Sequence, residues 1–472
     1  MSDRKNSLEI YVADLLTDIY KYCRPTIASG ATPVEKGDIK NPWFNIECVL
    51  GNSRVLTPSG NVPIKDININ DEIINYFGKT ARVKNKFERI HSGKIYNINI
   101  SGAYKDLEIT GEHPVLFRKN YNEKPYWITV KELFKLLPGI HSTKGKNGYL
   151  LMPKIHSDTR LFKNKILLKE PKIVWDLRLM RIFGWYLSEG FCNKKYPYIQ
   201  FTLGKHEKEY ADELVDLISS TGYGDVKLQD GTTTLVVFWK CKEFHKIIMD
   251  IFGTGAYKKK IPLWFNNLSD NMLKELIKYM VRGDGHRDAH TVHYSSYSTE
   301  LLHSVKNILI TLKYSFNISG SNGKENQIRI LGTNEDLLEI CDKKPTKEIK
   351  KEKNIQKRRM FYTSDGCWCR IREIKKTNTK CTVYNIETES EDYICESVLV
   401  HNCKQKRTSK AFTIPYAEWY KNCGEADKQY KDPVFVVENE LGEKIAAMRL
   451  EEWHNLICEL MDLRKILEEQ ND

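Results

Sequence analysis

The chain has 472 residues, a formal net charge of +12 and 12 cysteines. This length predicts about three domains, and the basic excess favours a nucleic-acid partner, although a basic surface that contacts only solvent would also carry such a charge. Irregular cysteine spacing indicates buried or catalytic thiols rather than a disulfide framework, and we expect a reducing cytosol. No stretch of about eighteen apolar residues is present to span a membrane. We therefore expect no membrane partner and a cytoplasmic location in a microbial or virus-infected host cell.

Residues 1–47 begin with an amphipathic helix and end at the start of a hairpin. Apolar residues recur at helical spacing from Leu8 to Ile19, which gives the helix one core-facing stripe. The stretch from Thr26 to Gly37 is rich in turn residues. Asp38 to Glu47 is then expected to enter a strand.

From Cys48 the pattern changes to short alternating strands separated by turn signals, which predicts an all-β unit. The expected strands are Val49–Thr57, Glu72–Phe77, Val83–Arg89, Lys94–Ile100, Leu107–Thr110 and Val115–Arg118. Thr110 and His113 stand three residues apart at the end of one strand. A histidine before a proline is usually structural, but its place about sixty residues after Cys48, a possible nucleophile, makes His113 a candidate catalyst.

Residues 151–350 contain an internal repeat. A helical stripe from Leu179 to Leu187 is followed by Glu189 and a glycine, and a second stripe from Leu276 to Val281 is followed by Asp284 and a glycine. A repeated helix that ends in an acid is a strong architectural signal. Two such carboxylates, if close together, can hold Mg²⁺ through oxygen ligands.

The tripeptide His401-Asn402-Cys403 carries a second kind of chemistry. The side-chain amide of Asn402 can attack its own peptide carbonyl and cut the chain, and His401 can move the proton. Cys403 then supplies a thiol nucleophile, with Cys48 as its upstream counterpart. Such tripeptides also arise by chance, so the flanking sequence decides the interpretation.

Removal of residues 48–402 joins Glu47 to Cys403 and Lys404, with Asp38 shortly before. Glu47 and Lys404 would then stand at positions i and i+2 of one strand and face the same side. Asp, Glu and Lys in this order are typical of a metal-dependent nuclease site. After Cys403, a helix around Trp419, a strand from Pro433 to Val437 and a final helix predict an α/β domain.

Four sequence blocks together resemble inteins with a Hint-type splicing fold, over residues 48–150 and 361–402. They are Cys48, Thr110 with His113, Val383–Ile386 with Tyr393, and Val400–Cys403. The resemblance implies an all-β Hint domain that needs no cofactor.

The same resemblance assigns a role to each splicing residue. Cys48 attacks the Glu47 carbonyl while Thr110 and His113 assist, Cys403 captures the acyl group, and Asn402 cyclises with help from His401. Two positions depart from the family: Glu391 stands where many inteins carry histidine, and Asn385 where aspartate is common.

The two helix-acid motifs resemble those of LAGLIDADG homing endonucleases, which implies an α+β domain with a pseudo-twofold repeat over residues 151–350. Glu189 and Asp284 match the acids that share Mg²⁺ between the two strands of double-stranded DNA at a homing site. Lys260, before a proline, matches an assisting lysine, although a lone lysine is more often a phosphate contact. Gly184 fits a close helix contact, but its counterpart is Tyr279, which we expect to hold the helices apart.

The joined segments 1–47 and 403–472 resemble PD-(D/E)xK nucleases of the phage or archaeal Holliday-junction-resolvase class. The resemblance implies a split α/β restriction-endonuclease-like host domain. Asp38 and Glu47 would bind Mg²⁺ and Lys404 would polarise the water, with Gln405 a weaker candidate. The partner would then be DNA, possibly branched, and the spliced nuclease possibly a homodimer.

The sequence leaves four interpretations open. The first is a self-splicing precursor with an embedded DNA endonuclease and a split nuclease host. The second is an endonuclease whose splicing has decayed, and the third is a Hint protein that cleaves without ligation. In the fourth, the host is a non-catalytic nucleic-acid-binding protein. Intact Cys48, His113, Asn402 and Cys403 favour the first.

Overall fold

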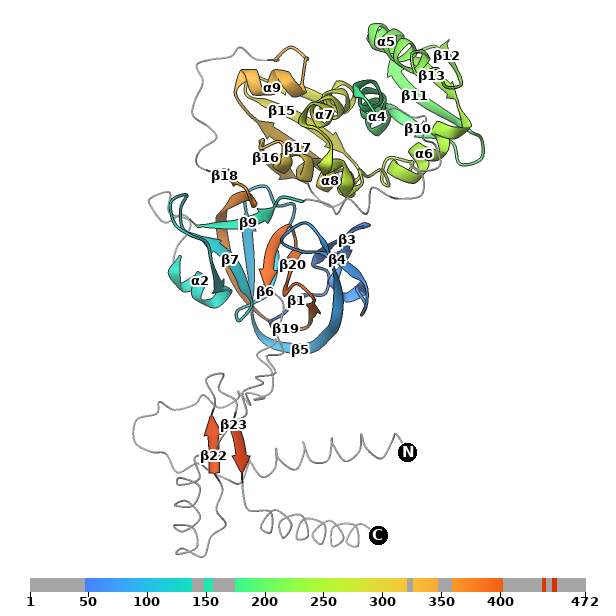
Figure 1. Cartoon of the computed structure of the whole chain (residues 1–472). Coiled ribbons are helices and arrows are strands. Elements are labelled where there is room, and N and C mark those ends of the chain that lie inside the picture. Colours follow the sequence, from blue (N-terminus) through green and yellow to red (C-terminus); the bar gives the residue numbers. More distant parts are fainter. Residues whose placement is uncertain are drawn as a thin grey trace, which may run out of the picture. The chain divides into compact units, whose positions relative to one another are not determined.

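A computed structural model describes residues 47–137, 148–155, 175–320, 326–346 and 359–401, and the backbone of two later strands (Figure 1). The chain divides into one unit of residues 1–45 and 410–472 and another of residues 46–409. In the first unit, β22 (Phe435–Glu438) pairs antiparallel with β23 (Lys444–Ala447), and β22 overlaps the strand expected from Pro433 to Val437. Asp38, Asn402, Cys403, Lys404 and Gln405 lie outside the described residues.

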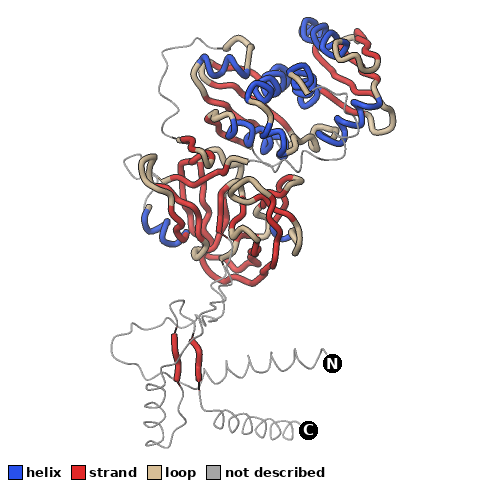
Figure 2. Tube along the Cα trace, viewed as in Figure 1, coloured by secondary structure: helices blue, strands red, loops and turns tan. Residues whose placement is uncertain are grey.

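A strand-rich body is built from two separate segments of the chain (Figure 2). Thirteen strands form its sheet, with β1 between β6 and β19. One short helix, α2 (Val130–Leu136), begins with a capping box made by Thr129 and Glu132. The strands are β1 (Val49–Leu50), β2 (Arg54–Thr57), β3 (Gly60–Pro63), β4 (Glu72–Ile74), β5 (Thr80–Ile100), β6 (Leu107–Thr110), β7 (Pro114–Arg118), β8 (Tyr126–Thr129), β9 (Tyr149–Pro153), β18 (Met360–Thr363), β19 (Gly366–Thr388), β20 (Asp392–Cys395) and β21 (Val398–His401).

The long strand β5 corrects one expectation. Two strands separated near Ile90 were expected, but β5 continues through this region and pairs with β19 along nearly its whole length. His91 lies opposite Cys381, and Gly93 opposite Thr379. The partner strand supplies ladder hydrogen bonds here, so a polar stretch with an exposed Ile90 remains extended.

A second body, within residues 175–346, repeats one order of elements: helix, two strands, helix, two strands, helix. Each repeat has a four-stranded antiparallel sheet, in the orders β10-β11-β13-β12 and β14-β15-β17-β16. The internal repeat that the two helix-acid motifs predicted therefore includes the sheets and the other helices of this body. The first repeat comprises α4 (Leu177–Glu189), β10 (Gly190–Cys192), β11 (Tyr198–Gly204), α5 (Lys208–Ser219), β12 (Asp225–Asp230), β13 (Thr234–Lys240) and α6 (Lys242–Phe252), and the second α7 (Asp270–Asp284), β14 (Gly285–Asp288), β15 (Thr291–Ser296), α8 (Thr299–Thr311), β16 (Ser315–Ser319), β17 (Asn326–Leu331) and α9 (Asn334–Ile340).

The first helices of the two repeats, α4 and α7, pack directly against each other. A side chain caps each N-terminus, because Asp176 accepts from the Leu179 amide at 3.1 Å and Ser269 from the Met272 amide at 3.4 Å. At Gly184, a Cβ atom would lie 2.7 Å from the Leu276 carbonyl oxygen. The two backbones thus approach as closely as a glycine allows, and the expectation that Tyr279 separates them is wrong.

Helix α8 contacts the strand-rich body inside the unit of residues 46–409. Glu300 forms an ion pair with Arg54, with 3.1 Å between Oε1 and Nη1. The buried Lys306 donates from Nζ to Ser397 Oγ, in the tight turn between β20 and β21. Helix α8 therefore contacts β2 through Glu300 and the β20–β21 turn through Lys306.

Within the described part of the chain, no helix combines the length and apolar character needed to cross a membrane.

Candidate active sites

The first site surrounds Cys48, which is fully buried at the start of β1. The Cys48 amide donates to Thr110 Oγ1 at 3.0 Å, and the Thr110 amide donates to the Cys48 carbonyl at 2.9 Å. Thr110 is also buried, at the end of the neighbouring strand β6. The peptide between Glu47 and Cys48 is therefore fixed by a hydroxyl, in the pair of residues that the sequence singled out.

His113 connects the two ends of the strand-rich body. Its Nε2 lies 2.8 Å from the carbonyl oxygen of His401, and its ring lies beside the backbone of Cys48. Nδ1 makes no hydrogen bond to any described residue. Burial lowers the pKa of His113 to about 3, so the ring is neutral at physiological pH. Since a carbonyl oxygen only accepts, Nε2 carries the proton and Nδ1 carries the lone pair.

The residues around His401 complete this site. His401 pairs with Asp392 across the β20–β21 hairpin, and its ring contacts Trp127 edge-on at 5.1 Å between centroids. Burial raises the pKa of Asp392 to about 6. The sequence analysis missed Asp392 and Trp127, because neither belongs to a recognisable block. Only the position of Asp392 beside Tyr393 gave a signal.

The two departures from the intein pattern occupy different environments. Asn385 is buried and accepts hydrogen bonds from the Tyr393 hydroxyl at 3.0 Å and the Ile386 amide at 2.8 Å. Glu391 lies in a turn with a φ of 65°. Tyr393 in turn lies edge-on to His113. Asn385 therefore supports the ring that packs on His113.

The second site lies where α4 and α7 end. Glu189 is the last residue of α4 and Asp284 the last of α7. Burial, followed by the neighbouring charge of Asp284, raises the pKa of Glu189 to about 7. Glu189 is partly buried and Asp284 is exposed. Their two negative charges repel each other, and a divalent cation with oxygen ligands would relieve this repulsion. The residues therefore fit a Mg²⁺-type ion.

Two lysines flank this acid pair. The buried Lys259 donates from Nζ to the carbonyls of Tyr186 at 2.7 Å and Leu187 at 3.1 Å, at the end of α4. Burial lowers its pKa to about 8, although Asp284 and Glu189 attract the charge. Lys343 donates to the Gly285 carbonyl at 2.7 Å, just beyond α7, and burial lowers its pKa as well.

These lysines occupy equivalent places, because each follows the last helix of its repeat. The sequence analysis singled out the adjacent Lys260, whose Nζ instead donates to the Ser59 carbonyl at 3.1 Å, in an exposed position. Lys343 was missed because it lies in a run of charges. Its place after α9, matching Lys259 after α6, was the signal that could have found it.

The sheets of both repeats expose a polar face. Along β15, Val292, Tyr294 and Ser296 are buried while the alternate residues are partly exposed, and β11 follows the same pattern. The partly exposed positions include Gln200, Thr202, His293 and Ser295. Hydrogen-bonding side chains on a sheet face suit contacts with base edges and phosphates.

Comparisons with known proteins gave distant similarities. No protein-family model matches the chain. The ATP-dependent DNA helicase Hel308 of Thermococcus kodakarensis is 22% identical over 75% of this chain and 36% of its own length. Two uncharacterized proteins of Methanocaldococcus jannaschii are 26% and 23% identical, over 54% and 84% of this chain. The chain spans only 32% and 56% of those two proteins.

Among solved structures, homing endonucleases are similar to part of this chain. I-DmoI in complex with DNA and Mn has 12% identity and a TM-score of 0.27, over 33% of this chain and 89% of its own. The homing endonuclease I-WcaI bound to its DNA recognition sequence has 15% identity and a TM-score of 0.25, over 38% of this chain and 86% of its own.

Proposed function

We propose that the chain is a self-splicing precursor of the intein type, in which residues 48–402 form the excised segment. The contact of His113 with both ends of that segment carries the proposal, since one neutral imidazole lies beside Cys48 and binds the carbonyl of His401. Thr110 supports it by fixing the Cys48 amide. Splicing needs a reduced Cys48, so we place the reaction in the cytoplasm.

The first half of the reaction is an acyl shift at Cys48. Its thiol loses a proton as the sulfur bonds to the Glu47 carbonyl carbon, the carbon–nitrogen bond breaks, and the departing nitrogen takes that proton to become an amine. Thr110 and His113 supply the hydrogen bonds and proton relay at that nitrogen. The Cys403 thiol then accepts the acyl group and returns the Cys48 thiol.

The second half releases the segment. The side-chain nitrogen of Asn402 attacks its own carbonyl, closes a succinimide and breaks the bond to Cys403. His113 holds the preceding carbonyl, and His401 assists the proton transfer. The freed Cys403 amine attacks the thioester, which forms the final peptide bond and restores the thiol. Each bond that breaks is replaced by a new bond, so the splicing reaction requires no cofactor and no external energy source.

Intact mass spectrometry of the purified chain tests splicing. Two products are expected: residues 48–402, and residues 1–47 joined to 403–472. A Cys48→Ala, Asn402→Ala chain should remain whole, whereas Cys48→Ala alone should still lose its C-terminal segment through Asn402. Cys381→Ala, at a half-buried cysteine that takes no part in the reaction, is the matched control and should splice normally. Products from the double variant would overturn the assignment.

A second function belongs to the acid pair. We propose that the segment also cuts double-stranded DNA, at a site like the uninterrupted host gene. The observation that favours it is the meeting of Glu189, Asp284, Lys259 and Lys343 at the ends of two packed helices. When bound, Mg²⁺ would activate a water and polarise a phosphate oxygen. Glu189 and Asp284 would hold it, and the lysines would offset charge on the phosphate.

Duplex DNA that spans the joined codons of Glu47 and Cys403 tests this activity in the locked Cys48→Ala, Asn402→Ala chain. With Mg²⁺, we expect cutting that Glu189→Gln abolishes. Glu209→Gln, at an acid in the first turn of α5, should cut like the parent. Equal cutting by Glu189→Gln would remove the acid from the mechanism, and no cutting by the parent would indicate a decayed endonuclease.

For the joined segments 1–47 and 403–472 we propose a PD-(D/E)xK nuclease with Asp38, Glu47 and Lys404 at its Mg²⁺ site, acting on branched or linear DNA. The alternative is a host that binds nucleic acid without cutting it. Loss of cleavage in a Lys404→Ala spliced product, with DNA binding retained, would separate the two.

A further inference from the structure

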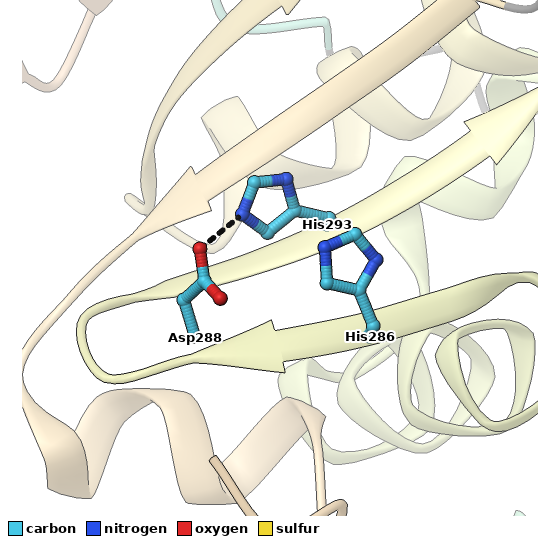
Figure 3. A group of neighbouring side chains, drawn as sticks. All are labelled: His286, Asp288 and His293. Atoms are coloured by element: carbon cyan, nitrogen blue, oxygen red, sulfur yellow. Dashed lines mark ion pairs between the residues drawn. The ribbon is translucent and has the colours of Figure 1, made fainter. Parts of the chain in front are cut away.

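Two histidines and an aspartate meet on one face of the β14–β15 hairpin (Figure 3). His286 and Asp288 alternate along β14, and His293 of β15 lies directly opposite His286. One ligand atom from each residue lies within 4.8 Å of the others. Oδ2 of Asp288 is 3.3 Å from Nε2 of His293. None of the three belongs to the acid pair or to the splicing residues.

The hydrogen bonds behind His293 determine which of its ring nitrogens carries a proton. Gln327 Oε1 accepts from Arg329 Nε at 2.9 Å, and the Gln327 amide nitrogen donates to Ser295 at 3.4 Å. The oxygen therefore faces His293 Nδ1, 3.2 Å away, and Nδ1 must donate. In the neutral ring, Nε2 then directs a lone pair at Asp288.

That arrangement favours a cation between the two side chains. Nε2 of His293 makes no hydrogen bond to a described residue, and a lone pair facing a carboxylate oxygen at 3.3 Å is repulsive. Asp288 is oriented from its other side, because Thr346 Oγ1 donates to Oδ1 at 2.8 Å. Donors held from behind in this way are typical of metal ligands. A proton on Nε2 would also remove the repulsion between His293 and Asp288, but His286 would then have no role in the arrangement.

His286 supplies the third donor. Its ring stacks on His293 with 4.2 Å between centroids and 12° between planes, so the two rings lie face to face. His286 is exposed, and one of its ring nitrogens lies within 4.8 Å of a ligand atom of His293 and of Asp288.

We propose that His286, Asp288 and His293 bind one divalent transition-metal ion of the zinc class. Two imidazoles and one carboxylate suit zinc, nickel or copper and do not suit Mg²⁺. Three protein ligands leave a fourth position for water. The site is thus chemically distinct from the all-carboxylate pair at the helix ends, although β14 begins directly after Asp284.

Zinc titration by calorimetry tests the proposal on the locked Cys48→Ala, Asn402→Ala full chain after treatment with a chelator. The parent should bind one more zinc ion than a His286→Ala variant, and Mg²⁺ should not compete. His293→Ala and Asp288→Asn should each weaken this site at least tenfold, and Gln327→Leu should weaken it by about 10- to 100-fold, since Gln327 orients His293. Zinc bound by cysteines contributes equally to the parent and to each variant, so it does not affect the differences in zinc binding between them.

His290→Ala is the matched control, since His290 lies in the same turn outside the cluster, and it should bind zinc like the parent. His286 is exposed, so its replacement preserves the fold, which apo-protein thermal unfolding verifies. Unchanged zinc number and affinity in His286→Ala would overturn the site. The site would also be overturned if zinc binding were lost in His293→Ala but not in His286→Ala or Asp288→Asn. The readout is metal binding, so its failure leaves DNA cutting and splicing untouched.

Discussion

Gly184 of α4 packs against its own repeat counterpart, Tyr279 of α7. A Cβ atom at Gly184 would lie 2.6 Å from the Tyr279 Cβ, and one at Gly283 would lie 2.5 Å from the Cβ of Ser188, which is the counterpart of Gly283. Each pair of equivalent positions thus combines one glycine with one larger residue. The Tyr279 ring is buried edge-on to Trp185 of α4, and its hydroxyl donates to Glu213. At each of these two contact points, close packing of α4 and α7 therefore needs one glycine and not two.

Gly184→Ala should destabilise the protein despite the better helix propensity of alanine. Propensity alone would stabilise the helix by about 1 kcal/mol, whereas the overlap with Tyr279 and the Leu276 carbonyl should cost about 1–3 kcal/mol. Urea unfolding of the locked chain measures the net sign. A gain in the free energy of unfolding would show that α4 and α7 have room to separate.

Lys259→Met should reduce DNA cutting at least a hundredfold, while Lys260→Met should change it less than threefold. Only Lys259 places its ammonium at the end of α4, whereas Lys260 reaches the Ser59 carbonyl. Single-turnover cleavage rates on one DNA substrate compare the neighbours directly. The reverse order of effects would restore Lys260 as the assisting residue.

Glu189→Gln should stabilise the protein above pH 7 and leave its stability unchanged below about pH 4.5. The raised pKa of about 7 means that the folded state keeps a proton that the unfolded state releases between these values. Stability is therefore lost as pH rises through this window. The loss is up to about 3 kcal/mol, and the glutamine variant should not show it. Urea midpoints at pH 4.5, 6 and 8 follow the difference. A constant offset at all three would exclude titration as its cause.

His113 should make the folded state sensitive to acid. Its pKa of about 3 lies below that of an unfolded histidine, about 6.5, so between these values the unfolded state binds the extra proton. Stability should fall as pH decreases through this range, by at most about 1.4 kcal/mol per pH unit. In a His113→Gln chain that slope should shrink, and equal slopes would argue against a neutral buried ring.

Host nuclease activity should be absent before splicing. Burial raises the pKa of Glu47 to about 8, so before splicing we expect this carboxyl to be mostly protonated at pH 7, and a protonated carboxyl is a poor ligand for Mg²⁺. A locked chain with Glu189→Gln and Asp284→Asn should leave branched and linear DNA intact. The spliced product should cut, and should lose activity on Glu47→Gln. Equal cutting by the locked chain would show that the site assembles without ligation.

Local patterns predicted the features that depend on neighbouring residues. Helical spacing predicted the stripes of α4 and α7, because side-chain periodicity is a property of a single segment. The continuous strand β5 could not be predicted, since β19, which holds it extended, lies far along the chain. Lys343 could not be identified as a site residue from the sequence for a similar reason. Only the spatial equivalence of two repeats separates it from other charged residues.

The hydrogen bond between His113 and the His401 carbonyl can form only after the ribosome has synthesised residue 401. These residues are 288 positions apart, and a ribosome adding about 5–20 residues per second needs roughly 15–60 seconds to make the second after the first. Strand β1, next to Cys48, likewise lacks one of its two neighbours until β19 exists. A thiol that reacted sooner would sever an unfinished polypeptide. In the proposed splicing reaction, one imidazole shared between distant ends would therefore delay the chemistry until translation of the segment is complete.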